Sequence, residues 1–444
     1  MRDIAVLAVL VVFTAWTLRR PWIGVMMWTC VSLMSPHVEF GYAAAAWPVA
    51  TVVAGATLAS MLFTREKQNP FIGGAVWAML AFTAWITITL PFSFYLDECL
   101  PLWERSMKIF LMLFVTLALV DNKHKLNVFV WVNVVSIAYY GVKGGVFTVL
   151  TAGNYRVWGP GGFIGGNNEV ALAVIMVIPL MRYLQLQMTQ KWAKLAMSGS
   201  MVLCALTALG TYSRGALLGV SAMGFYFWLK SQRKLLWAIL IPIIGVAVLS
   251  VMPSQWWARM DTIKTYDADD SALGRINAWW MAWNLARDKF FGGGFMIYSL
   301  PVFEIYAPEP NRVHAAHSIY FQVLGEHGFV GLFLFLLIGV LTWLTASSLI
   351  KRYRDDPQRR WGADLGAMVQ VGMIGYAVAG AFLSLSYFDL PYNLMVMCVV
   401  ARHILRRDEA AAAAAAAQGA PPPGAAAALP ATPARSNSIK MRSP

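Results

Sequence analysis

Residues 329–350 read FVGLFLFLLIGVLTWLTASSLI, a stretch that contains no Asp, Glu, Lys or Arg. A helix needs about 20 mainly apolar residues to cross the hydrocarbon core of a bilayer, so this stretch alone predicts a transmembrane helix. The whole 444-residue chain has the same character, since 59% of its residues are hydrophobic and only 13% are charged. Soluble domains are about 25% charged. The apolar runs are also continuous rather than alternating, so we expect an all-α, polytopic integral membrane protein and exclude soluble enzymes and β-barrels.

Further apolar segments occur along the chain. They lie near residues 3–17, 22–35, 43–63, 71–93, 106–120, 126–150, 169–187, 194–211, 215–230, 235–252, 329–350, 363–386 and 392–405. The first two and the last are short, and Pro21 interrupts the first pair, so the first 35 residues cross either once or twice. We therefore expect about 12 transmembrane helices, with 13 as the alternative.

Lys and Arg gather on every second connector between these segments. The clusters are Arg19/Arg20, Arg65/Lys67, Lys123/Lys125, Lys191/Lys194, Lys230/Arg233/Lys234, Lys351/Arg352/Arg354/Arg359/Arg360 and Arg402/Arg406/Arg407. Cytoplasmic connectors carry an excess of these residues, which predicts that this face and the C-terminus are cytoplasmic. The net charge of +13 is therefore mainly a signal of topology, and nucleic acid is not an expected partner.

On the opposite face only one connector, 253–328, is long. Long loops inside compact proteins are usually functional or disordered, and the many Trp, Phe and Tyr residues here argue against disorder. We expect it to carry short helices packed on the outer surface of the membrane. The chain thus divides into a first helix bundle (1–252), this outer loop (253–328), further membrane helices (329–407) and a disordered Ala/Pro-rich cytoplasmic tail (408–444).

Two arginines on the outer face are candidates for binding an anion. Arg214 lies in the sequence TYSRG at a span end, where a charge is costly unless it is paired or faces a polar cavity. Arg275 follows Gly274 in a stretch rich in Trp. A guanidinium presents a planar fork of donors to phosphate oxygens, so both residues suit a pyrophosphate. The alternatives are a salt bridge for Arg214 and a snorkelling side chain for Arg275.

The sequence RVHAAHS, residues 312–318, precedes an apolar helix that we expect to begin at Ile319. His314 and His317 are three residues apart and can share one helical face. A histidine at this position can act as a general base near neutral pH. Two other interpretations are a zinc site completed by a carboxylate such as Glu326, and histidines with a purely structural role. Arg312 in the same stretch is a further candidate for binding the pyrophosphate.

Three weaker candidates lie on other outer connectors. Asp389 stands alone between two apolar spans, where it can orient a histidine, pair with an outer arginine or simply form a turn. Asn168 can cap a helix that begins near Glu169. Arg156 is a possible phosphate or sugar contact.

Two other patterns give little support for a ligand site. Gly292–Gly294 predicts a flexible turn and lacks the Lys-Ser/Thr sequence of a phosphate-binding P-loop. The acidic run 267–270 can attract a divalent cation, but a solvated charge run explains it equally simply.

In their order and membrane side, these elements resemble the O-antigen ligase and O-antigen polymerase superfamily. The matching motifs are Gly166–Glu169, Ser213-Arg214-Gly215, Gly274-Arg275 followed by Gly292–Gly294, and His317-Ser318 followed by Glu326 and Gly328. The resemblance is strongest to the lipopolysaccharide O-antigen ligases and covers roughly residues 1–405.

The resemblance implies a multi-pass protein of the bacterial inner membrane whose active site faces the periplasm. It implies inverting transfer of a glycan from undecaprenyl pyrophosphate to a sugar hydroxyl of lipid A–core. It assigns the general base to His317 and pyrophosphate binding to Arg214 and Arg275, and it implies no nucleotide sugar, no ATP, no cofactor and no required metal.

Three features leave the acceptor open. One group of polymerases carries Arg-x10-Gly repeats, whereas here Asn167 and Ala286 follow Arg156 and Arg275 at that spacing. Many relatives have His-Asn where this chain has His317-Ser318. The pattern is also similar to enzymes that transfer glycans to protein hydroxyls. A transporter of polyisoprenoid lipids is the non-enzymatic alternative, although the sequence lacks the internal repeats of many transporters.

Overall fold

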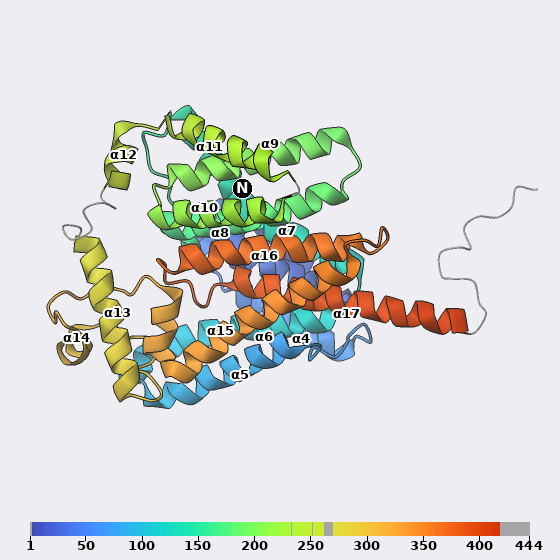
Figure 1. The fold of residues 1–444 in the computed structure, drawn as a ribbon. Coiled ribbons are helices and arrows are strands. Elements are labelled where there is room, and N and C mark those ends of the chain that lie inside the picture. Colours follow the sequence, from blue (N-terminus) through green and yellow to red (C-terminus); the bar gives the residue numbers. More distant parts are fainter. Residues whose placement is uncertain (1, 232, 251, 262–269, 418–444) are drawn as a thin grey trace, which may run out of the picture.

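The computed structural model describes residues 2–231, 233–250, 252–261 and 270–417. Within these ranges it consists of helices and contains no strand (Figure 1), which confirms the predicted all-α class. The α-helices are α1 (Arg2–Arg19), α2 (Pro21–Met34), α3 (Pro36–Phe40), α4 (Val49–Phe63), α5 (Gly74–Thr89), α6 (Leu96–Leu119), α7 (Lys123–Leu150), α8 (Asn167–Gln187), α9 (Lys191–Gly210), α10 (Arg214–Lys230), α11 (Lys234–Ser250), α12 (Ser254–Asp261), α13 (Asp270–Asp288), α14 (Leu300–Tyr306), α15 (Ile319–Tyr353), α16 (Arg360–Gly380) and α17 (Asp389–Ala417). Three short 3₁₀ helices complete the order, η1 (Ala43–Ala46), η2 (Leu90–Phe92) and η3 (Gly162–Ile164).

Six of the described helical segments are long and apolar enough to cross a membrane. They are Gly74–Phe92, α7, α8, α9, α15 and α16. The expected number of about 12 is larger, and length and charge account for the difference. Helices α2 and α4 have only 14 and 15 residues, and α1 carries Arg2, Asp3 and Arg19 within its 18 residues. Pro21 opens α2 directly after α1 ends, so the expected break in the first pair is confirmed.

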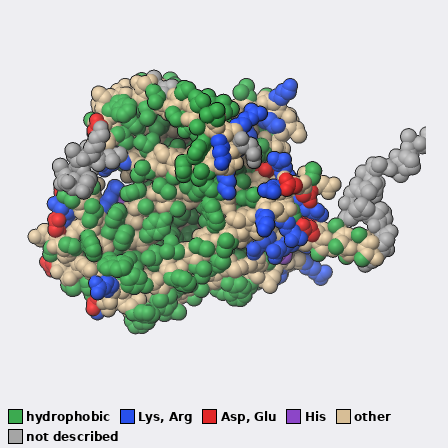
Figure 2. Space-filling model, in the orientation of Figure 1, with side chains coloured by type: hydrophobic (Ala, Val, Ile, Leu, Met, Phe, Trp, Pro, Cys, Tyr) green, Lys and Arg blue, Asp and Glu red, His purple; other side chains and the backbone are tan. Residues whose placement is uncertain are grey.

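The two ends of the bundle differ in charge. In Figure 2, hydrophobic side chains cover much of the visible side of the bundle, and Lys and Arg gather at the end from which α17 projects. Helices α12, α13 and α14 lie at the opposite end (Figure 1). An apolar band between polar ends is the surface that a bilayer requires.

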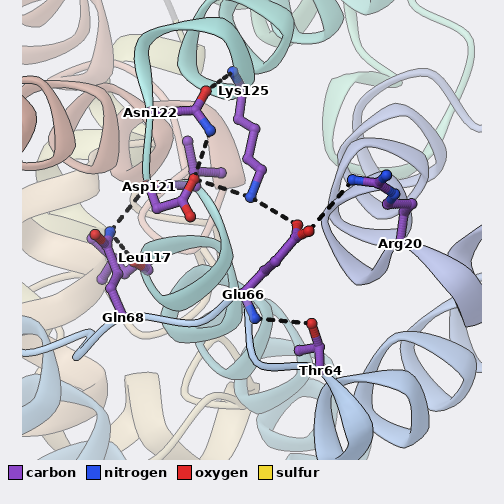
Figure 3. Close-up of polar contacts among 9 residues, drawn as sticks. Arg20, Thr64, Glu66, Gln68, Leu117, Asp121, Asn122 and Lys125 are labelled. Carbon is purple, nitrogen blue, oxygen red and sulfur yellow. Dashed lines mark hydrogen bonds and ion pairs between the residues drawn. The ribbon is translucent and has the colours of Figure 1, made fainter.

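Polar contacts at the Lys- and Arg-rich end join three predicted cytoplasmic connectors (Figure 3). Glu66 accepts an ion pair from Arg20 at 3.4 Å and another from Lys125 at 3.5 Å. Lys125, whose side chain is only 8% exposed, also pairs with Asp121 at 3.0 Å. Gln68 donates to the carbonyl oxygens of Leu117 and Val120. Connectors expected on one side of the membrane therefore do meet one another.

The opposite end contains the segment expected as a long outer loop. Helices α12 and α14 are short, with 8 and 7 residues, whereas α13 has 19 residues and packs along the start of α15. Gly328, with φ 68°, interrupts the helical path of α15. The residues after this kink coincide with the apolar stretch 329–350, and those before it form a separate helical piece at the outer end.

Helix α17 lies in the centre of the bundle. Its residues from Leu394 to Ala401 are fully buried, as are those of α8 from Ala171 to Val177. The polyalanine run continues α17 as far as Ala417, beyond the packed bundle (Figure 1). Residues 418–444 of the expected disordered tail lie outside the described residues.

Candidate active site

A pocket at the outer end of the bundle gathers three arginines from segments far apart in the sequence. Arg214 opens α10, Arg259 lies on α12 and Arg275 lies on α13, and all three line this pocket. The other lining residues are Asn168, Tyr212, Ser213, Gly215, Phe382 and Leu383. We call this hollow the arginine pocket. Three guanidinium groups, which stay charged at any physiological pH, around one small space form a site suited to a multiply charged anion.

The starts of α8 and α10 are fixed side by side, which places Asn168 and Arg214 in one pocket. Asn167 donates from Nδ2 to the carbonyl oxygen of Thr211 at 2.8 Å. Ser213 caps α10, because its Oγ accepts from the backbone N–H of Ala216 at 3.2 Å. This cap satisfies one of the free donors at the helix start and fixes where Arg214 leaves the backbone.

The prediction that Asn168 caps the helix after it is wrong. Helix α8 begins one residue before Asn168, so its N-cap position falls on Gly166, which has no side chain to accept a hydrogen bond. Asn168 is the second residue of the helix and its side chain lines the arginine pocket instead. Glu169 in the same turn lies close enough to Arg275 for the two charges to interact.

His317 lies beside the arginine pocket, and the charge of Arg275 acts on its ring. The ring centroid of His314 is 5.2 Å from that of His317. Both histidines precede the first turn of α15, which begins at Ile319 as predicted. The expectation that they share one helical face is therefore wrong, and the fold of the loop brings the two rings together.

Helix α13 holds the histidine loop in place through two side chains. Asn277 donates to the carbonyl oxygens of Glu309 and Arg312 at 2.8 and 3.0 Å. Trp279 donates from Nε1 to the carbonyl oxygen of Ala316 at 2.7 Å. Because Arg275 lies on the same helix, these bonds also fix the position of the loop relative to that guanidinium.

Two residues at the site adopt a backbone conformation that is unfavourable for residues other than glycine. His317 has φ 42° and Tyr212 has φ 59°. Such left-handed conformations cost about 1–3 kcal/mol and occur preferentially at functional sites. Tyr212 is held by a hydrogen bond from its hydroxyl to the carbonyl oxygen of Gly153. Tyr212 lies two residues before Arg214 in the sequence, and His317 lies close enough to Arg275 for the charge of Arg275 to act on its ring.

His317 is held in its neutral form. Burial, followed by the charges of Arg275 and His314, lowers the pKa of His317 from 6.5 to about 4. A neutral imidazole has a free lone pair and can accept a proton, which is the state that a general base requires.

We predict that the acid limb of kcat/KM lies near pH 4, well below the ordinary histidine range. A bound pyrophosphate adds negative charge beside Arg275, so the acid limb of kcat should lie higher.

The same pKa shift predicts how stability depends on pH. Between pH 6.5 and 4 the unfolded chain binds a proton at His317 that the folded chain does not, so the free energy of unfolding should fall as the pH falls through this window. Steady-state rates and unfolding transitions from pH 4 to 8 test both statements. A kcat/KM limb near 6.5 would contradict them.

Gly274 leaves room for His314. A Cβ atom at position 274 would lie 3.0 Å from Cδ2 of that ring, closer than ordinary contact. We predict that Gly274→Val displaces the histidine loop and lowers kcat by up to about 10²-fold, since a shift of about 1 Å at a catalytic group has effects of this size. Gly199→Val is the matched control, because nothing lies within 4 Å of a Cβ atom there. An equal loss in both variants would indicate a general folding defect instead.

Three other predicted residues lie outside the arginine pocket. Arg312 forms ion pairs with Glu309 at 2.8 Å and with Asp270 at 3.4 Å. Arg156 lies over the rings of Trp158 and Tyr212 and lines a neighbouring hollow. Asp389 accepts a hydrogen bond from Ser32 at 2.5 Å, so its described partner is Ser32 and not His317.

The glycine turn and the carboxylate proposed for a zinc site have structural partners. The backbone N–H groups of Gly293 and Gly294 donate to the carbonyl oxygens of Gly325 and Glu326. The Glu326 carboxylate accepts from the hydroxyl of Tyr387 at 2.5 Å. Among the residues that the structure describes, no group of three or more His, Cys, Asp or Glu side chains is placed to hold a metal ion. The acidic run at 267–270 falls outside the described residues except for Asp270.

Comparison with known families assigns the part of the chain that carries these groups. Residues 199–336 match the family model described as O-antigen ligase. This segment of the chain is similar to that family. Arg214, Arg259, Arg275, His314 and His317 all lie within it. Residues 1–189 match a family of unknown function, and no curated protein matches the chain.

The sequence alone did not identify two residues that line the arginine pocket. Arg259 lies in the outer loop, and nothing in its sequence neighbourhood distinguishes it from a solvated charge. Tyr212 precedes the Ser-Arg-Gly motif directly, so its position was a usable signal. Their roles depend on the packing of α12 and α10 around the pocket.

Proposed function

We propose that this protein transfers a glycan from undecaprenyl pyrophosphate to a sugar hydroxyl of lipid A–core, with inversion at the anomeric carbon. The proposed setting is the bacterial inner membrane, with the arginine pocket facing the periplasm, the C-terminus in the cytoplasm and about 12 membrane crossings. The observation that carries the proposal is the convergence of Arg214, Arg259 and Arg275 beside a neutral histidine, within the O-antigen ligase domain.

The arginines act on the leaving group. In the proposed reaction the bond between the anomeric carbon and the pyrophosphate oxygen breaks, and the pyrophosphate keeps the electron pair. Fixed donors aimed at the developing charge stabilise such a transition state more strongly than water does. Arg275 also acts on the base, because its charge lowers the pKa of His317. A bound pyrophosphate offsets that charge, so donor binding makes His317 more basic.

His317 acts on the acceptor. It takes the proton of the sugar hydroxyl while the hydroxyl oxygen forms the new bond to the anomeric carbon. The alkoxide character that develops on the oxygen makes a weak nucleophile effective. No nucleotide or other energy source enters the scheme, because the pyrophosphate linkage of the donor is already activated.

Reconstitution in liposomes tests the proposal. Purified full-length protein is supplied with lipid-linked O-polysaccharide and lipid A–core, and the electrophoretic mobility of the acceptor is followed. A ladder of slower-migrating acceptor supports the proposal. Consumption of the donor with elongation of the glycan alone, or with labelling of a protein hydroxyl, would instead identify a polymerase or a protein glycosyltransferase. Export of intact donor without hydrolysis would identify a transporter.

We predict that the reaction needs no divalent metal, because the proposed charge stabilisation comes from arginines. The transfer rate should be unchanged in EDTA. Loss of activity in EDTA that zinc restores would contradict this prediction and favour a metal bound near His314 and His317.

A further inference from the structure

A second cleft at the outer end lies next to the arginine pocket. Arg105 on α6 and Phe163 in the connector before α8 line it, together with Ser32 at the end of α2. We call it the Arg105 cleft. The connector that carries Phe163 leads directly into the first turn of α8, which carries Asn168. The connector between α16 and α17 contributes Phe382 to one hollow and Phe388 to the other. The two hollows are therefore neighbours built on shared connectors.

The guanidinium of Arg105 is presented to this cleft. Its central carbon lies 3.7 Å from the centroid of the Phe163 ring. Stacking on a ring holds the guanidinium flat and leaves its N–H groups at the edges available. Among the described residues, none accepts a hydrogen bond from Arg105 or forms an ion pair with it within 4.0 Å. The side chain is thus oriented and available to bind an anion.

A buried carboxylate beside Arg105 is incompletely satisfied. Asp389 is only 3% exposed and its charge acts on Arg105. One carboxylate oxygen accepts from Ser32, whereas Oδ1 has no hydrogen-bond partner within the described part of the chain. Nδ1 of His37, another residue of the cleft wall, also lacks a described partner. Buried polar atoms are normally paired, so these atoms point to a polar ligand that carries both an anion and hydroxyl groups.

The cleft also has an apolar side, which is formed by Trp28 and Ile109. Lys108, one turn after Arg105 on α6, lies in the same wall. Its ammonium group forms an ion pair with Glu104 at 2.6 Å. Basic residues at this end of the bundle run against the positive-inside pattern. Snorkelling explains how such side chains reach the interface, but it does not explain the stacked Arg105 or the unsatisfied Asp389. A headgroup with a phosphate, attached to a lipid, fits both sides of the cleft.

We propose that the Arg105 cleft binds a phosphate of the acceptor glycolipid and so positions the acceptor opposite the donor in the arginine pocket. The inference rests on the proposed transfer to lipid A–core. Apart from Phe388, the cleft residues named here belong to residues 1–189, the part that matches a family of unknown function. The cleft gives that part a role in recognising the acceptor, separate from the donor chemistry of the O-antigen ligase domain.

Binding without turnover tests the inference. Full-length protein in nanodiscs of uncharged lipid is titrated with lipid A–core in its phosphorylated and enzymatically dephosphorylated forms. The wild-type protein should prefer the phosphorylated form by about 10-fold or more, the size expected for hydrogen bonds to a charged group. Arg105→Gln should bind both forms equally. Arg287→Gln, which removes an exposed arginine of α13, should keep the wild-type preference.

A second variant distinguishes loss of the phosphate contact from a general folding defect. Phe163→Leu keeps every charge but removes the stacking surface, so it should reduce the preference without abolishing donor binding. A preference that survives in Arg105→Gln overturns the inference. Added phosphatidylglycerol that binds the wild type but not Arg105→Gln, with equal binding of the two acceptor forms by the wild type, also overturns it by assigning the site to bulk phospholipid. Because binding is read without transfer, failure of the proposed reaction leaves this measurement interpretable.

Discussion

Replacing His317 by asparagine is expected to lower the rate of glycan transfer by about 10²–10⁴-fold, the range contributed by a positioned general base. Asparagine is chosen because position 317 has φ 42°, and asparagine tolerates this left-handed conformation better than alanine does. The substitution therefore removes the proton acceptor without adding backbone strain. The measurement is the single-turnover rate with saturating donor and acceptor.

His124→Asn is the matched control for this substitution. His124 is an exposed histidine at the start of α7, in the connector that the Glu66 contacts place at the opposite end of the bundle. It should retain the full transfer rate. The His317 variant should also bind donor with nearly the wild-type affinity. A purified His317→Asn protein that transfers glycan at the wild-type rate would remove this residue as the base.

Replacing Arg275 by glutamine is expected to lower kcat by about 10²–10³-fold, as does the loss of one preorganised donor to a developing oxyanion. The same change at Arg214 should have an effect of similar size. Because both side chains line one pocket, the double variant should lose less than the product of the two single losses. The measurement is a double-mutant cycle on kcat and on kcat/KM.

Lysine substitutions separate charge from geometry at the same positions. A guanidinium can bind two phosphate oxygens at once, whereas an ammonium acts as a single point charge. Arg214→Lys and Arg275→Lys should therefore be intermediate between wild type and the glutamine variants. Arg287→Lys serves as the control on α13. Full rate and full donor affinity in Arg214→Lys would show that a bidentate pyrophosphate contact is the wrong role for this residue.

The fold class and several element boundaries could be predicted from the sequence because they depend on local composition. Continuous apolar runs give helices, Pro21 starts α2 and Ile319 starts α15. The number of crossings was harder, because short helices such as α2 and α4 fall below the length that marks a membrane span by itself. The helical face proposed for His314 and His317 was wrong because residue spacing carries no information on where a helix begins.

The candidate site was predictable only where a residue stands out in its own stretch of sequence. Arg214 stood out because a charge at a span end is unusual. Arg275 stood out beside Gly274 in a Trp-rich stretch, and His317 stood out as a histidine before an apolar helix, whereas Arg259 and Arg105 did not. The partners of many site residues come from distant segments of the chain. Asn277 donates a hydrogen bond to the carbonyl oxygen of Arg312, and Ser32 donates one to the carboxylate of Asp389. Such pairs follow from tertiary packing, and no local pattern encodes them.

The contacts of Glu66 also set an order for biosynthesis. They join Arg20 before α2, the connector after α4, and Lys125 at the start of α7. The pair between Arg20 and Glu66 can form once residue 66 has been synthesised, whereas the pair between Glu66 and Lys125 must wait for residue 125. Chains generally fold from the N-terminus as they emerge. The three segments can therefore be joined at Glu66 as soon as α7 begins, before Asn168 and the arginines of the arginine pocket have been translated.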